Sequence, residues 1–148
     1  MSAGLVIGLV VVLAACIAAR WMRGRWIAVT VRGNSMAPTF QDGQRLVVRR
    51  AAVAACARGD VVVFALSPEQ LERDLSKDIP YRVKRVAAVA GDPVPVWLRE
   101  SLRAGPHARI PPGKIVVAGD NALSQDSRHL GTIDTRAVVA VLHAPRPS

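Results

Sequence analysis

Cysteine, histidine and lysine are scarce in this chain, which limits the kinds of site that it can hold. Its 148 residues include two cysteines and three histidines, and only three of its twenty cationic residues are lysines. Cys16 lies in an apolar segment and Cys56 in an alanine-rich stretch far along the chain, so we expect no disulfide between them. The spacing of His107, His129 and His143 fits neither a metal site nor a Ser-His-Asp triad. The sequence therefore predicts no metal site.

Aromatic residues are also few, at 4% of the chain, although the formal net charge is +9. The arginines are scattered, with no aromatic residues interleaved and no recognisable nucleic-acid-binding motif, which argues against a nucleic-acid partner. Two interpretations of the positive charge stay open. One is a surface that contacts anionic lipid headgroups, and the other is a basic surface that is merely solvated.

The N-terminal residues predict a membrane anchor. No charged residue occurs in the range 3–19, and this apolar segment approaches the ~20 residues that a helix needs to span a hydrocarbon core. Tryptophan next to arginine is typical of the membrane interface, and the residues concerned are Trp21, Trp26, Arg20, Arg23 and Arg25. We expect residues 1–25 to form one transmembrane anchor and residues 26–148 to form one small domain.

Two other interpretations of the N-terminal segment stay open. One is a cleaved secretory signal. The other is a lipoprotein signal, because Leu13-Ala14-Ala15-Cys16 resembles a lipobox in which Cys16 is lipidated. A secretory signal normally begins with basic residues, whereas only the α-amine precedes the apolar segment here. We therefore favour a retained anchor.

After the anchor, the pattern becomes that of a β protein. Short apolar runs are separated by glycine, aspartate and proline, which favour turns. The runs that predict strands are 27–31, 45–48, 60–66, 81–89, 94–98, 115–118 and 137–142. Ser67, followed by Pro68 and Gln70, predicts the capping box of one short surface helix. Residues 100–112 are expected to form a long exposed loop.

A serine and a lysine are chemically distinctive within this β pattern. Lys84 lies in the apolar run 81–90, and Ser35 lies between small residues in the turn 33–39. A serine hydroxyl becomes a good nucleophile when a base accepts its proton, and a lysine can be that base where an apolar site disfavours its charged form. Each residue also has an ordinary explanation, because serines are common in turns and strand lysines usually point to solvent.

Four blocks of the chain, in family order, resemble the type I signal peptidases, which are membrane serine proteases with a Ser/Lys dyad. The blocks are 33–40 with Ser35, 58–64, 81–92 with Lys84, and 119–128 with Ser124. One block alone is a weak signal. Four blocks that follow an apolar N-terminal segment and cover most of the chain make a specific resemblance.

The resemblance implies a role for several residues. Ser35 is expected to be the acylated nucleophile, and Lys84, in its neutral form, the general base. Ser124 matches a serine whose hydroxyl orients the lysine amine. Asp126 and Arg128 match an acid and base pair that supports the site, with Arg85 close by.

Two further parts of the site are implied in the same way. The turn 119–121 is expected to bring the last block against the nucleophile. Met36, together with nearby strand valines, is expected to line shallow pockets for small substrate side chains.

The implied fold is mainly β, with the antiparallel coiled β-sheets of the signal peptidase catalytic core after one N-terminal transmembrane helix. The implied activity is that of a cell-membrane serine endopeptidase that cleaves signal or leader peptides after small residues and needs no cofactor. Precursor proteins and membrane lipids are its implied partners. The resemblance favours a catalytic domain on the extracytoplasmic face, whereas the arginines after the apolar segment favour the cytoplasmic side.

Two other functions stay open: a dedicated protease that matures one partner by removing its propeptide, and an inactive membrane scaffold of the same fold. The chain also departs from the family pattern in two places. Gly33 stands where several members have a serine that donates to the oxyanion, and removal of such a donor costs ~10²-fold or more in turnover. The segment 121–124 is one residue shorter than usual.

Overall fold

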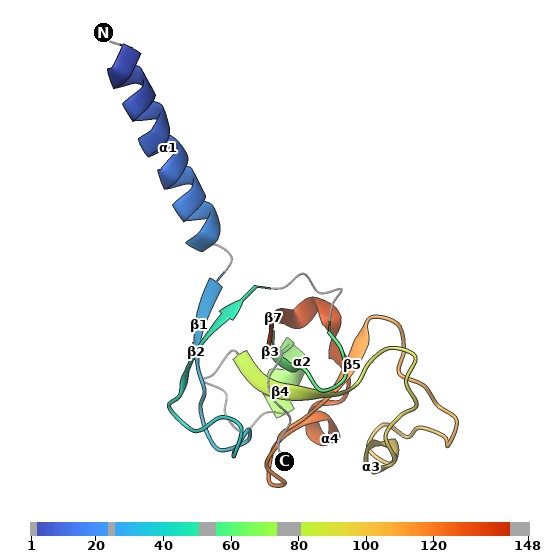
Figure 1. Ribbon diagram of the computed structural model, residues 1–148. Helices are drawn as coiled ribbons and strands as arrows, with labels where there is room; N and C mark the ends of the chain where they lie inside the picture. The colour runs from blue at the N-terminus through green and yellow to red at the C-terminus, as the bar shows by residue number, and fades with distance from the viewer. Residues whose placement is uncertain (1–2, 24–25, 51–55, 74–80, 143–148) are drawn as a thin grey trace.

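The computed structural model describes residues 3–23, 26–50, 56–73 and 81–142 (Figure 1). Helix α1 (Ala3–Arg23) extends away from the β-rich remainder of the described chain. Its apolar side chains are exposed, including Ile7 at 65% and Leu9 at 68%. Among the described residues, no helix is long and apolar enough to cross a membrane, so the single-pass anchor stays a prediction.

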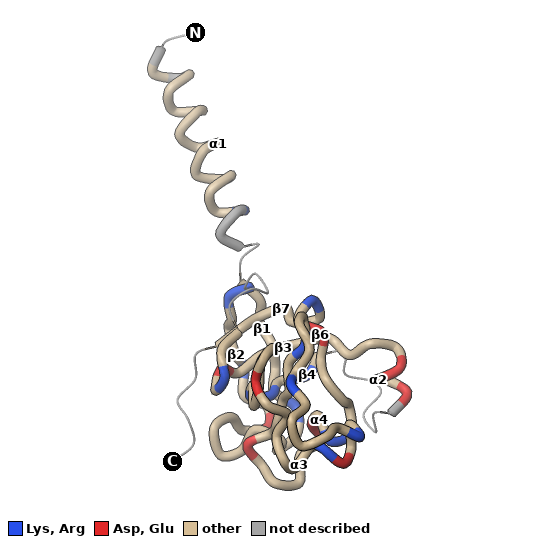
Figure 2. The backbone as a smooth tube through the Cα atoms, turned by 90° about the vertical axis from the view of Figure 1, so that its right-hand side faces the viewer, with Lys and Arg blue, Asp and Glu red and all other residues tan. Residues whose placement is uncertain are grey.

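The interfacial residues predicted beside this helix are described only in part. Arg25 and the side chains of Trp21 and Arg23 lie outside the described residues. The side chains of Arg20 and Trp26 are both exposed. Most of α1 carries no charge, whereas lysines and arginines occur at several separate places on the β-rich part (Figure 2).

The first two strands form a small antiparallel sheet. β1 (Trp26–Thr30) pairs with β2 (Arg45–Arg49), and the register places Trp26 opposite Arg49. Along β2, Leu46 and Val48 are buried while the residues between them are exposed. This alternation is the period of two that places one face of a strand on the core.

A second sheet has five strands, in the order β6-β5-β4-β3-β7, and every neighbouring pair is antiparallel. Its strands are β3 (Val61–Ala65), β4 (Tyr81–Ala88), β5 (Lys114–Ala118), β6 (Ile133–Asp134) and β7 (Val138–Leu142). The mainly antiparallel β fold predicted from the sequence is therefore confirmed. The central strand of this sheet is β4, which also carries Lys84.

Both faces of the five-stranded sheet are covered by apolar side chains. On β3, Val61 and Val63 join a cluster with Leu46 and Val48 of the small sheet, whereas Val62 lies in a second cluster with residues of β5. Side chains alternate across a strand, so a strand covered on both faces is apolar throughout. This explains the uninterrupted apolar run of β3.

The capping box predicted around Ser67 is present at the start of α2 (Pro68–Arg73). The Ser67 N–H donates to Gln70 Oε1 at 3.0 Å, and the Gln70 N–H donates to Ser67 Oγ at 3.3 Å. Two orphan donors at the helix start are thereby satisfied.

The strand predicted at 94–98 is wrong, because α3 (Val96–Arg99) occupies this part of the chain. Proline has a fixed φ that suits a helix start, and Pro95 precedes the helix. Leu98 is fully buried while Val96 is 75% exposed, which is one-sided helical burial. The loop at 100–112 is not fully exposed either, since Ile110 packs in the same cluster as Leu98.

Three short elements near the C-terminus were not predicted. They are α4 (Ser127–Leu130), β6, and a 3-10 helix at Thr135–Ala137. Elements of two to four residues are too short to show a hydrophobic period.

Candidate active site

One cleft of about 1020 Å³ brings together segments that are far apart in the sequence. It is lined by β1, by the turn that follows it, by the first half of β4 and by the loop between β5 and α4. Ser35, Lys84 and Ser124 are all among its lining residues. Three of the four sequence blocks therefore meet at one surface.

Lys84 is held inside the fold by the strand that carries it. It lies opposite Val62 in the β3–β4 register, and it is only 3% exposed. Its Nζ atom donates a hydrogen bond of 2.6 Å to Ser124 Oγ, and that hydroxyl donates in turn to the carbonyl of Gln125 at 3.1 Å. Lysine is rarely buried, and burial favours its neutral form over the ammonium.

Ser35 lies in the turn after β1, where it is half-buried. Gly33, with φ of 77°, adopts a left-handed conformation that suits glycine, and its N–H donates to Asp42 Oδ1 at 2.7 Å. On the other side, the carbonyl of Ser35 accepts a hydrogen bond of 3.1 Å from the Asn121 N–H. Hydrogen bonds therefore hold the backbone both before and after Ser35.

The approach of the two segments requires a glycine at position 119. A Cβ atom built on Gly119 would lie 2.5 Å from the Ser35 carbonyl oxygen, and it would also overlap the Ser124 side chain. Contacts this short do not occur at real Cβ atoms, and the Ser35 partner is backbone that cannot turn aside. Gly119 thus lets the last block lie directly against the segment that carries Ser35.

A bidentate ion pair joins Arg85, the residue after Lys84, to Asp120 in the turn 119–121. Arg85 Nε donates to Asp120 Oδ1 at 2.8 Å, and Arg85 Nη2 donates to Oδ2 at 2.7 Å. Their side chains are 12% and 4% exposed. Arg85 Nη1 also donates to the Gly59 carbonyl at 2.8 Å, and Nη2 donates to Thr39 Oγ1 at 3.4 Å, so Arg85 links all four blocks.

The pKa values of this pair follow from its geometry. The hydrogen bond to Asp120 raises the pKa of Arg85, against the lowering effect of burial. Burial would by itself raise the pKa of Asp120, but hydrogen bonds from Arg85 and Thr39 and the Arg85 charge together hold that pKa below its usual range. The pair is charged at neutral pH. The sequence did not predict the pairing of Arg85 with Asp120, although Asp120 lies in the block 119–128.

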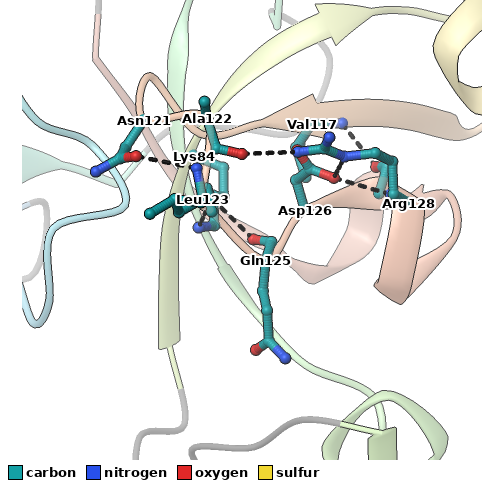
Figure 3. Close-up of polar contacts among 10 residues, drawn as sticks. Lys84, Val117, Asn121, Ala122, Leu123, Gln125, Asp126 and Arg128 are labelled. Atoms are coloured by element: carbon teal, nitrogen blue, oxygen red, sulfur yellow. Dashed lines mark hydrogen bonds and ion pairs between the residues drawn. The ribbon is translucent and has the colours of Figure 1, made fainter.

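Asp126 and Arg128 form the second ion pair, as Figure 3 shows. Asp126 caps α4 by accepting the Arg128 N–H at 3.0 Å, and its carboxylate also accepts from Arg128 Nε at 3.0 Å and Nη2 at 2.9 Å. The hydrogen bond to Asp126 raises the pKa of Arg128. The guanidinium also lies 5.9 Å from the centre of the Trp97 ring, within cation–π range.

Met36 has a different environment from the other predicted site residues. Its side chain is fully buried in the cluster shared by the two sheets, and it is not among the residues that line the cleft. A substrate contact at Met36 therefore stays a prediction. Valines of the cleft include Val29, Val31 and Val83.

In the part of the chain that the structure describes, no histidine or cysteine lines the cleft. His107 and His129 are exposed and do not line it, and His143 lies outside the described residues. Burial, and then the nearby Asp60 charge, raises the pKa of the Cys56 thiol. Within the described ranges, no group of three or more His, Cys, Asp or Glu side chains could hold a metal ion.

Comparisons with known proteins agree with these observations. Residues 3–103 match the family described as "Signal peptidase, peptidase S26". The chain is 28% identical to signal peptidase I V of Bacillus subtilis (strain 168), over 79% of this chain and 83% of that protein. It is 31% identical to signal peptidase IB of Staphylococcus aureus (strain COL), over 74% of this chain and 72% of that protein.

Proposed function

Because the chain belongs to the S26 signal peptidase family and is a serine endopeptidase, we propose that it cleaves signal or leader peptides with a Ser35/Lys84 dyad. One observation carries the proposal: Ser35, buried Lys84 and Ser124 line a single cleft, and Lys84 donates to Ser124. The two relatives named above are signal peptidases, which supports the choice of substrate.

The proposed reaction uses only groups of this chain and water. Ser35 Oγ attacks the scissile carbonyl while the neutral Lys84 amine accepts the hydroxyl proton. The C–N bond then breaks, and Lys84 gives this proton to the leaving amine. A water molecule, deprotonated by the same amine, attacks the acyl-enzyme, and Ser35 regains its proton as the product acid leaves. No cofactor is needed.

Ser124 has a positioning role in this scheme. Its hydroxyl accepts one N–H of Lys84 and donates its own proton to the Gln125 carbonyl, so its lone pair stays directed at the amine. An amine held through one of its N–H bonds can direct its lone pair at the nucleophile. The ion pairs Arg85–Asp120 and Asp126–Arg128 hold the two ends of the loop that carries Ser124.

In this proposal, backbone N–H groups stabilise the oxyanion. Gly33 has no side chain, and its N–H is already bound to the Asp42 carboxylate at 2.7 Å. We assign the N–H of Ser35 as the principal donor, because it lies on the nucleophile itself. Such a donor is most effective when it is positioned before the reaction. The bonds from the Gly33 N–H to Asp42 and from the Asn121 N–H to the Ser35 carbonyl would hold it in place.

The proposal places the catalytic domain at a membrane, with residues 1–25 as a single-pass anchor and the domain on the extracytoplasmic face. Support comes from the uncharged range 3–19, from the exposed apolar side chains of α1, and from a helix that points away from the β-rich domain. Exposed apolar side chains over a helix of 21 residues gain free energy when lipid covers them.

The experiment that tests this proposal uses the full chain in detergent with a precursor that carries an Ala-X-Ala motif. The wild type is expected to release the mature protein with its new N-terminus directly after the motif. Ser35→Ala and Lys84→Ala should each abolish release, and the double variant should be scarcely worse, because the two residues act as a unit. Ser101→Ala, at an exposed turn, is the matched control.

Two results would count against the dyad or the substrate. Cleavage that survives Ser35→Ala removes the proposed nucleophile. A protein that ignores every Ala-X-Ala precursor, but processes one partner encoded beside it, is a dedicated maturation protease instead.

A further inference from the structure

Leu123 has the most exposed large apolar side chain in the part of the chain that the structure describes, at 94%. An isolated exposed leucine is ordinary on a protein surface. This leucine, however, lines the cleft together with Ser35 and Lys84. Burial of a leucine side chain is favourable, so a bound molecule that covers Leu123 gains affinity from it.

The backbone around Leu123 is fixed to the segment of the nucleophile. The Leu123 N–H donates to Asn121 Oδ1 at 3.0 Å, and the Ser124 N–H donates to the Asn121 carbonyl at 3.0 Å. The Asn121 N–H donates in turn to the Ser35 carbonyl at 3.1 Å. Figure 3 shows the Asn121 side chain turned toward Leu123 in this way. The exposed side chain is therefore presented from a constrained turn.

Leu123 belongs to a different wall of the cleft from the apolar residues of β1. Ile27 and Val29 lie on β1, the strand that leads into the turn of Ser35. We place the substrate segment before the cut along β1, because an extended peptide can add to the edge of a sheet. Leu123 lies on the loop between β5 and α4. This loop contacts the segment of Ser35 through the hydrogen bond from the Asn121 N–H to the Ser35 carbonyl. With the segment before the cut along β1, the wall that carries Leu123 is left for the segment after the cut.

We propose that Leu123 contacts the substrate residue directly after the scissile bond and favours an apolar side chain there. This inference rests on the proposed function, since it assigns a substrate preference to the same cleft. It also predicts different effects on the two steps of the reaction, acylation and deacylation. The leaving segment departs with the proton that Lys84 supplies, so contact with Leu123 affects acylation and not the hydrolysis of the acyl-enzyme.

The test uses the full chain in detergent and two peptides that differ only in the residue after the cut, leucine or serine. The wild type is expected to favour the leucine peptide by about tenfold in kcat/KM. Leu123→Asn should remove this preference, and Leu123→Met should retain it. Val96→Asn is the matched control, because Val96 is 75% exposed and does not line the cleft.

The outcomes separate this inference from the proposed function. A wild type without preference, an equal loss on both peptides, or a change in preference before the cut would overturn the role of Leu123. An unchanged melting temperature in Leu123→Asn, with the rate of deacylation also unchanged, supports it. Failure of the wild type to cleave either peptide would refute the proposed function itself.

Discussion

Lys84 and Ser124 are 40 residues apart in the sequence, yet their side chains meet in a buried hydrogen bond of 2.6 Å. The strand β4 supplies the amine and the loop before α4 supplies the hydroxyl. The bond fixes an amine at the end of a four-carbon chain that has many rotamers in solution. The first prediction concerns the loss of this hydroxyl.

Ser124→Ala should lower kcat by about 100-fold with little change in KM, because the amine loses its orientation and a small misplacement costs about that factor. Steady-state cleavage of the Ala-X-Ala precursor measures both constants. Ser127→Ala is the control, since Ser127 is also fully buried but accepts the Val117 N–H. It should lower stability by about 1–3 kcal/mol and leave kcat near the wild-type value. Equal kcat losses in both variants would contradict the positioning role.

The rate of cleavage should rise with pH as the Lys84 ammonium loses its proton, because only the neutral amine can accept a proton from Ser35. Lys84→Arg should be inactive at every pH, since a guanidinium does not give up its proton in this range. His107→Ala and His129→Ala should leave the pH–rate profile unchanged. A profile that follows histidine titration would reverse the assignment of the base.

Gly119→Ala should abolish most activity, because its Cβ would push the last block away from the Ser35 carbonyl and the Ser124 side chain. Gly105→Ala is the matched control, since a Cβ there meets nothing within 4 Å. Cleavage assays and thermal unfolding of both variants make the comparison. If Gly119→Ala keeps wild-type kcat, the close approach of the two segments is not needed for catalysis.

Asp120→Asn should destabilise the protein by about 3 kcal/mol at pH 7, because it leaves the Arg85 charge poorly paired in a largely buried site. The folded-state pKa of Asp120 is lowered, so its contribution is complete above the unfolded pKa and is lost as pH falls through the folded pKa. The stability difference between wild type and variant should therefore shrink in acid. Urea unfolding between pH 7 and pH 3 measures it.

The control for that comparison is Asp134→Asn. Its partner Arg136 has a side chain that is 88% exposed, and asparagine can still cap the following 3-10 helix. Only a small stability change is expected. A similar loss in both variants would show that the burial of the Arg85–Asp120 pair has no special effect.

The last prediction concerns the side of the membrane. Protease added to intact spheroplasts should digest the chain from Trp26 onward while α1 stays with the membrane, if the catalytic domain is extracytoplasmic. The same treatment of a cytoplasmic marker protein controls for leakage. Protection of the domain until the membrane is broken would contradict this orientation and favour a cytoplasmic maturation protease.

Local patterns were sufficient to predict most of the strands and the capping box at Ser67. Buried and exposed residues alternate in β2, because one face of this strand is covered, whereas β3 is apolar throughout because both of its faces are covered. Each pattern is visible in a strand of five residues. The segment 94–98 was misread because Val94, Trp97 and Leu98 suit a strand in composition. Its helix depends on burial of Leu98 against Ile110, which is a tertiary contact.

The residues of the candidate site were predictable from the sequence, but several of the contacts between them were not. Ser35, Lys84 and Ser124 were predicted from blocks that resemble a family, and the structure places them at one cleft. The pairing of Arg85 with Asp120 was not predicted, because it joins residues 35 apart through the register of two strands. The hydrogen bond from the Gly33 N–H to the Asp42 carboxylate was not predicted either, because it depends on how the loop between β1 and β2 folds back on itself.

The place of Lys84 on the middle strand of five suggests how the protein would fail on heating. Amides in a central strand exchange with solvent only when the whole sheet opens, whereas loops open locally at a much lower free-energy cost. Ser35 lies on such a loop, tied to the Asn121 turn by a backbone hydrogen bond of 3.1 Å. The proposed dyad would therefore join a strand whose amides exchange slowly to a loop whose amides exchange fast. Activity should fade reversibly, through separation of this strand and loop, at temperatures where hydrogen exchange in β4 is still that of the native state.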